Sequence, residues 1–202
     1  MNGNSYGDRT AGIALIGAAA LSMLAMAHHP ASLHAGAMIG IVHGAMILFV
    51  GTMTFGFAQL SRRLGLERPA VLAGLVAYAI GAIAEIGAAT VNGFAMPALA
   101  GHGASHEAID TLWFLNQALA GVGVAAIGTA YTFWSLALWR RHKLVAGLGI
   151  LAGAVPALLL LGGWIDMHLH WAVLVYAAIA IWAGLAGWLL LAGRLARESE
   201  TS

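Results

Sequence analysis

Six long apolar runs, separated by short polar segments, dominate the pattern of the chain. They cover about residues 11–28, 35–60, 70–92, 108–138, 144–164 and 170–193. An α-helix rises about 1.5 Å per residue, so about 20 apolar residues cross the roughly 30 Å hydrocarbon core of a bilayer. Because each run is about that long or longer, the pattern predicts an all-α polytopic membrane protein, a single domain of six transmembrane helices.

The composition narrows the class further. Of the 202 residues, 61% are apolar and only 8% are charged, and the mean hydropathy is +0.86. Such a chain lies outside the range of soluble globular domains, so its first partner is the lipid bilayer. The chain contains no cysteine. Disulfides, thiolate metal sites and cysteine nucleophiles are therefore excluded, and any metal ligand must be histidine, carboxylate, methionine or backbone oxygen.

The basic residues predict the orientation in the membrane. All nine fall on one side of the predicted bundle: Arg9, Arg62, Arg63, Arg68, Arg140, Arg141, Lys143, Arg194 and Arg197. Loops rich in lysine and arginine are normally cytoplasmic. We therefore expect a bacterial inner-membrane protein with both termini in the cytoplasm. The basic clusters are short, so the sequence does not support nucleic-acid binding.

The first apolar run has a second interpretation. It ends in Ala25-Met26-Ala27, which fits the small-x-small pattern of a signal-peptide cleavage site. Against cleavage, the run is longer than a typical signal core, and Arg9 is offset by Asp8. If cleavage occurred, His28 would become the amino-terminal residue and could chelate copper through its amine and its ring.

Eight of the nine histidines lie in or near the segments on the other side, which contain no lysine or arginine. They are His28, His29, His34, His43, His102, His106, His168 and His170. This segregation predicts a histidine-rich pocket that opens to the periplasm. In the alternative interpretation, histidine replaces lysine and arginine where positive charge is disfavoured, and the rings are merely interfacial.

Three polar residues fall inside the apolar runs at similar depths. Counted at 1.5 Å per residue, His43 lies about 12 Å below the outer boundary, Glu85 about 10 Å, and Asn116 at a comparable or shallower level. Ionisable side chains at this depth normally face protein, water or a ligand. Tyr78, Glu85 and Asn92 are spaced by seven residues and so share one helix face. We predict His43 as the partner of Glu85; a protonated Glu85 bonded to a neighbouring helix is the alternative.

Candidate metal ligands come from two hairpins. In an extended segment, His168 and His170 would share a side, and Asp166 would add a hard ligand. Together with the buried His43, they would hold copper, zinc or iron, and one of His28, His29 or His34 would complete the site. His43 and His168 are also the candidate ligands of a b-type haem. Nearby methionines favour copper, although methionine also fills gaps in helix packing.

A second pair of histidines ranks lower as metal ligands. His102 and His106 are four residues apart, the spacing that places two ligands on one helix face. Gly101 and Gly103, however, argue against a helix through His102. We therefore keep this pair as second-rank ligands.

One part of the chain carries a resemblance. Asn92-Gly93-Phe94 with Pro97, and Asn116-Gln117, lie within residues 60–142. This region resembles small multi-pass bacterial inner-membrane proteins of domain-of-unknown-function type. The resemblance implies a six-helix bacterial fold and supplies no activity, substrate or ligand.

Three functions remain open at this point. The first is a pocket for a transition metal or haem b in redox or metal-handling work, such as an oxidoreductase in which Glu85 and Asn116 assist catalysis; a metal-assisted hydrolase is a variant. The second is a small proton-coupled permease for a small-molecule ligand, with Glu85, His43 and Asn116 as a relay. The third is a non-catalytic structural subunit. Whether the chain forms a homo-oligomer is also open.

Overall fold

The computed structural model describes residues 3–30 and 36–195, with side chains from Tyr6 onward. Within these ranges every regular element is helical. The long helices are α1 (Gly3–Ala27), α2 (Ala37–Leu64), α3 (Pro69–Thr90), α5 (His106–Leu138), α6 (Lys143–Leu161) and α7 (Leu169–Leu191). A π-helical turn, η1 (Val91–Ala95), and the short α4 (Met96–Gly101) follow α3. Six helices are long and apolar enough to cross a membrane, which confirms the predicted fold class.

The third span is longer than the hydrophobic pattern predicts. It continues through η1 and α4 to Gly101, which leaves only a short connection before α5. The π-helical turn accommodates Asn92 and Gly93 without a break. Pro97 follows this turn as the second residue of α4. The predicted end of this span at residue 92 was therefore wrong.

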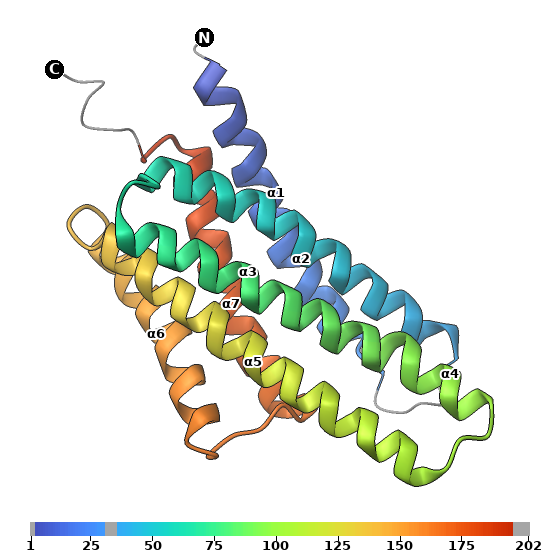
Figure 1. Ribbon diagram of the computed structural model, residues 1–202. Helices are drawn as coiled ribbons and strands as arrows, with labels where there is room; N and C mark the ends of the chain where they lie inside the picture. Colours follow the sequence, from blue (N-terminus) through green and yellow to red (C-terminus); the bar gives the residue numbers. More distant parts are fainter. Residues whose placement is uncertain (1–2, 31–35, 196–202) are drawn as a thin grey trace, which may run out of the picture.

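The helices form a closed ring. Each long helix packs against the next one along the chain, and α7 closes the ring against α1 (Figure 1). Glycines allow the backbones to approach closely. A Cβ atom on Gly128 of α5 would overlap the carbonyl of Gly153 in α6, and Gly12 of α1 lies in the same way against Gly187 of α7. Small residues commonly serve this purpose between membrane helices.

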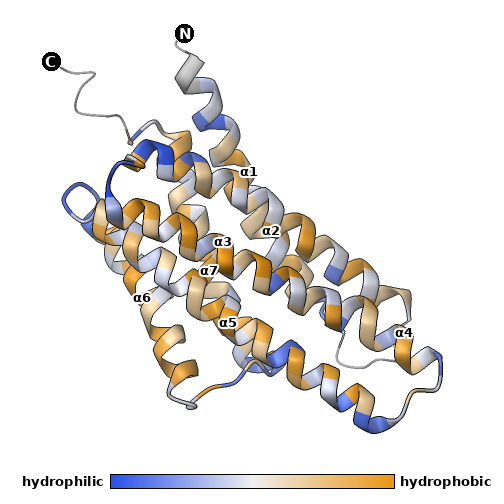
Figure 2. Ribbon diagram, viewed as in Figure 1, coloured by the Kyte–Doolittle hydropathy of each residue, from blue (hydrophilic) through white to orange (hydrophobic). Residues whose placement is uncertain are grey.

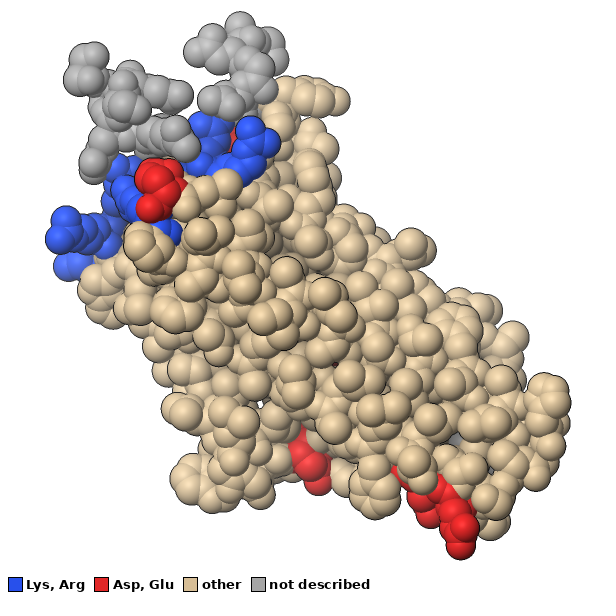
Figure 3. Space-filling view, in the orientation of Figure 1, with Lys and Arg blue, Asp and Glu red and all other residues tan. Residues whose placement is uncertain are grey.

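The two ends of the bundle differ in charge. Apolar residues fill most of the helix lengths, and hydrophilic residues collect toward the ends (Figure 2). The lysines and arginines of the described chain gather at the end where α1 begins and α7 finishes, which we call the basic end (Figure 3). Glu107, Asp110 and Asp166 lie at the opposite end, together with most histidines; we call it the histidine end.

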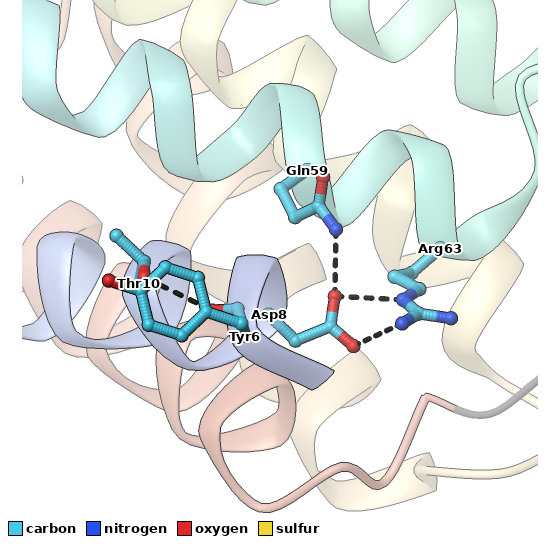
Figure 4. A network of polar contacts seen from close by, with 5 residues as sticks. All are labelled: Tyr6, Asp8, Thr10, Gln59 and Arg63. Atoms are coloured by element: carbon cyan, nitrogen blue, oxygen red, sulfur yellow. Dashed lines mark hydrogen bonds and ion pairs between the residues drawn. The ribbon is translucent and has the colours of Figure 1, made fainter. Parts of the chain in front are cut away.

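At the basic end, an ion pair ties α1 to α2 (Figure 4). Arg63 contacts Asp8 at 2.5 Å, and Gln59 donates a hydrogen bond of 2.7 Å to the same carboxylate. The side chains of Arg63 and Asp8 are only 10% and 12% exposed. The sequence interpretation set Asp8 against Arg9, but the partner that the fold supplies is Arg63.

Five aromatic rings fill the half of the bundle toward the basic end. They come from α2, α3, α5 and α7, are at most 2% exposed, and have neighbouring ring centroids 4.2–6.2 Å apart: Phe57, Tyr78, Tyr131, Trp134 and Trp182. We call them the aromatic cluster. The Trp182 indole N–H donates to the Val145 carbonyl at 3.0 Å. Stacked and tilted aromatic pairs of this kind pack densely, so we call this half of the bundle the closed half.

Candidate functional site

A cavity of about 510 Å³ opens in the half toward the histidine end. It lies between α1, α2, α3, α5 and α7 and reaches from His29 and His168 down to Tyr78 and Tyr131 of the aromatic cluster. Most of its lining is apolar. The polar side chains along it are Ser22, His29, His43, Tyr78, Glu85, Asn92, Asp110, Asn116, Gln117, Tyr131, His168 and Tyr176. His43, Glu85 and Asn116, the three residues singled out by their depth, therefore lie along one cavity.

Two histidines meet at the outer part of this cavity. The Nε2 atoms of His29 and His43 are 3.2 Å apart. Nδ1 of His43 lies 2.8 Å from the Ile39 carbonyl, to which it donates its proton. In a neutral His43 ring, Nε2 is then an acceptor, so His29 donates from its own Nε2. Burial of the ring, and secondly repulsion by His43, lower the pKa of His29 and favour its neutral form.

The π-helical turn positions His43 from the side of α3. Gly93 lies so close to this ring that a Cβ atom at position 93 would overlap the His43 side chain. Asn92, the preceding residue, lines the cavity. Single π-helical turns inside α-helices are often found at functional sites, because they turn side chains out of the regular α-helical register. Here the turn brings Asn92 to the cavity and Gly93 to the histidine.

Glu85 has a partner that the sequence interpretation missed. The Tyr176 hydroxyl of α7 donates a hydrogen bond of 2.5 Å to Oε2 of Glu85. The other carboxyl oxygen, Oε1, is buried and has no hydrogen-bond partner in the described structure. It lies against Gly123 of α5, where a Cβ atom would come within 2.5 Å. The predicted pairing of Glu85 with His43 was wrong, because α7 presents a phenol to the carboxyl and the imidazole meets His29 instead.

Tyr176 could have been found by the depth argument. It lies seven residues after the start of α7, or about 10 Å along the helix, which is the depth that the sequence predicts for Glu85. What the sequence does not reveal is that α7 faces α3 across the cavity. Gln117 similarly reaches the loop before α7, where it donates a hydrogen bond of 3.4 Å to the Met167 carbonyl.

The Asp166 segment does not form the predicted ligand pair. His168 caps α7 and His170 lies in its first turn, so the alternation of an extended strand does not apply. Nδ1 of His168 lies 2.6 Å from the Asp166 carboxylate. The backbone N–H of His168, and then its ring, lower the pKa of the exposed Asp166 carboxyl. His168 lines the mouth of the cavity, whereas His170 is exposed beside Trp171.

The remaining described histidines of this end do not line the cavity. His28, His102 and His106 are exposed. His28 and His102 donate from Nδ1 to the carbonyls of Leu24 and Ala98, four residues earlier. His34 lies outside the described residues. Within residues 3–30 and 36–195, no group of three or more histidine, aspartate or glutamate side chains gathers to hold a metal ion.

Comparison with known proteins does not identify a function for this cavity. The chain matches no protein-family model, and searches of curated proteins and of solved structures returned no match. The function therefore has to be argued from the cavity and its side chains.

Proposed function

We propose that the chain is a small proton-coupled permease of the bacterial inner membrane, which binds a small molecule in its cavity and exchanges a proton at Glu85. The observation that carries this proposal is the position of two buried titratable side chains, Glu85 of α3 and His43 of α2, along one cavity. Ionisable side chains inside membrane helices generally mark substrate pathways and proton relays. With the basic end in the cytoplasm, the cavity faces the periplasm.

The dimensions and lining of the cavity support a small-molecule ligand. Its volume of about 510 Å³ falls in the range of small-molecule sites and far exceeds the space that an ion needs. A mainly apolar lining with a few convergent polar groups is typical of such sites. The polar groups here form two anchors, the His29–His43 pair near the mouth and the Glu85–Tyr176 pair deeper in the cavity.

Each of these two pairs can bind and release a proton. The Tyr176 hydroxyl stabilises Glu85 after the carboxyl loses its proton, because a hydrogen bond to an ionised group is stronger than one to a neutral group. At the mouth, the Nε2 atoms of His29 and His43 are within proton-transfer distance. The aromatic cluster closes the cavity on the basic side, so release of a ligand to the cytoplasm requires the helices to rearrange.

The test is proton flux across a membrane. The purified full chain is reconstituted into liposomes that contain a pH-sensitive dye, and flux is followed after a pH gradient is imposed. We expect Glu85→Gln to abolish the protein-dependent flux. Glu107→Gln is the matched control, because Glu107 is an exposed carboxylate in the first turn of α5 at the same end of the bundle. Unchanged flux in Glu85→Gln overturns the proposal.

A transition-metal site is the second candidate, because of the His29–His43 pair. Two nitrogens that bind one tetrahedral metal at 2.0–2.1 Å are about 3.3 Å apart, and the two Nε2 atoms are 3.2 Å apart. The thioethers of Met26 and Met46 line the same cavity, and imidazole with thioether suits copper. Two imidazole nitrogens that bind a haem iron from opposite sides would be about 4 Å apart. The separation of the His29 and His43 Nε2 atoms therefore fits a tetrahedral metal ion better.

Elemental analysis and an absorption spectrum test this second candidate. Stoichiometric copper that is lost in His43→Ala and retained in His102→Ala would favour metal handling. His102 is a suitable control because it is an exposed histidine at the same end of the bundle. A Soret band would indicate haem. Purified protein with neither signal after incubation with copper would leave the permease as the candidate.

A further inference from the structure

The charge of the cavity identifies a class of ligand. Among the described residues that line it, the only carboxylates are Glu85 and Asp110, and none is a lysine or arginine. Glu85 is 6% exposed, and its Oε1 atom is buried without a partner. An anion would enter a medium of low dielectric constant in which no lysine or arginine of the described lining compensates its charge, which is costly. The cavity therefore favours a cation or a neutral molecule.

Aromatic side chains in the lining add to this preference. Tyr78, Tyr131, Tyr176 and Trp113 line the cavity. A cation over the face of tyrosine or tryptophan is attracted by the ring, most strongly where water is excluded. A small inorganic cation would instead need several oxygen or nitrogen ligands around one point, and the described chain gathers no such group of histidines and carboxylates. The apolar lining suits the carbon substituents of an organic cation.

We infer that the substrate is a lipophilic organic cation, such as a bulky ammonium compound, which binds in exchange for the proton of Glu85. This inference rests on the proposed function, because Glu85 is the proton site in both. The exchange requires that the Glu85 carboxyl carries its proton while the cavity is empty. When the cation enters, Glu85 releases one proton to the solution at the histidine end, and the ionised carboxylate becomes the counter-ion of the bound cation. The net charge of the cavity is the same before and after binding.

This exchange makes binding depend on pH. As long as Glu85 is protonated in the empty protein, each rise of one pH unit should strengthen cation binding about tenfold, because one proton leaves for each cation bound. The other titratable side chains around the cavity are Tyr131 of α5, Tyr176 of α7, His43 of α2, His29 beyond α1 and His168 before α7, with Tyr78 on α3 itself. Only Glu85 among these becomes negative in the ordinary pH range, and Asp110 is exposed at the mouth.

The experiment uses two ions of the same shape and opposite charge. Tetraphenylphosphonium and tetraphenylborate are titrated separately into the full-length protein in detergent, and binding is followed by tryptophan fluorescence and by calorimetry in buffers of different ionisation enthalpy. We expect the cation to bind with release of one proton and the anion to bind no better than to detergent alone. We expect Glu85→Gln to lose the proton release and the pH dependence, and Glu107→Gln to keep both.

A second variant keeps the test valid if Glu85→Gln does not fold. Tyr176→Phe removes the hydrogen bond to the carboxyl but keeps the carboxyl itself. Because the ionised form loses a donor, cation binding should move to higher pH while the release of one proton remains. Equal binding of the two ions, or cation binding without proton release in the unchanged protein, overturns the inference. Proton flux that depends on Glu85 would then still support the permease, so the two failures are distinguishable.

Discussion

The two halves of the bundle are built from the same helices and packed in opposite ways. Toward the basic end, five buried aromatic rings from four helices pack against one another, and Asp8 and Arg63 neutralise each other. Toward the histidine end, the same helices surround a cavity of about 510 Å³. Its polar pairs, His29 with His43 and Glu85 with Tyr176, contain no fixed positive charge. The closed half holds the ring of helices together, which allows the open half to keep ionisable groups without neutralising partners.

The largest expected effect comes from opening the closed half. Phe57 is 0% exposed and contacts four other rings of the aromatic cluster. Phe57→Ala should lower the free energy of unfolding by about 3–5 kcal/mol, because it leaves a hole among closely packed rings. The matched variant Met46→Ala, at the cavity wall, should cost less than about 2 kcal/mol, since one side of this residue already lacks packing contacts. Denaturant titrations in detergent measure both, and equal losses would contradict the contrast between the halves.

A smaller effect is expected at the ion pair of the basic end. Asp8→Asn leaves the 10% exposed Arg63 without its carboxylate and should destabilise the protein by about 1–3 kcal/mol. Glu67→Gln is the control, because Glu67 is an exposed carboxylate in the connection between α2 and α3 at the same end. Thermal unfolding of the two variants side by side gives the comparison. If both variants lose the same stability, the Asp8 pair is an ordinary surface contact.

A weaker, pH-dependent effect is expected at the histidine pair. The pKa of His29 is lowered by burial and by His43, so the unfolded chain takes up this proton at a higher pH than the folded protein. Stability contributed here is therefore complete above about pH 6.5, the usual pKa of histidine, and declines as the pH falls toward the lowered value. Unfolding midpoints between pH 5 and pH 8 measure the trend. His29→Gln should flatten it and His102→Gln should not; a slope that His29→Gln leaves intact must arise elsewhere.

The smallest effect is expected at the exposed loop before α7. The Asp166 carboxylate contacts the His168 ring, but the two side chains are 55% and 51% exposed. Solvent screens such a pair strongly, so Asp166→Asn should leave the unfolding temperature unchanged within error. Differential scanning fluorimetry is sufficient for this measurement. A clear loss of stability would mean that the loop supports the mouth of the cavity more firmly than its exposure indicates.

The sequence predicts the architecture because the bilayer imposes it. Long apolar runs must be helices to satisfy their backbone polar groups in lipid, so the six spans could be counted without a structure. Depth follows from the helix rise, and on that basis His43, Glu85 and Asn116 were assigned to one level. The structure lines one cavity with all three. The number of spans and the depth of a residue can each be predicted from one helix at a time, without knowing how the helices pack.

The pairings could not be predicted, because they depend on the order and rotation of the helices in the ring. Tyr176 reaches Glu85 only because α7 faces α3, and His29 reaches His43 only because the chain folds back after α1. The exposed histidines show the opposite error, in which side chains are grouped by residue type although the fold keeps them apart. A count of imidazoles groups His28 and His102 with His43, whereas each of the two bonds to a carbonyl of its own turn.

The closing of α7 against α1 has a consequence for engineering. Because the first and last helices are neighbours, the beginning of α1 and the finish of α7 lie at the same end of the molecule. A short linker could join them, and the chain could be reopened at the connection between α6 and α7, around Gly163. Such a circular permutant would keep every helix beside its present neighbours. The contacts around the ring therefore do not require α1 to be the first helix in the sequence.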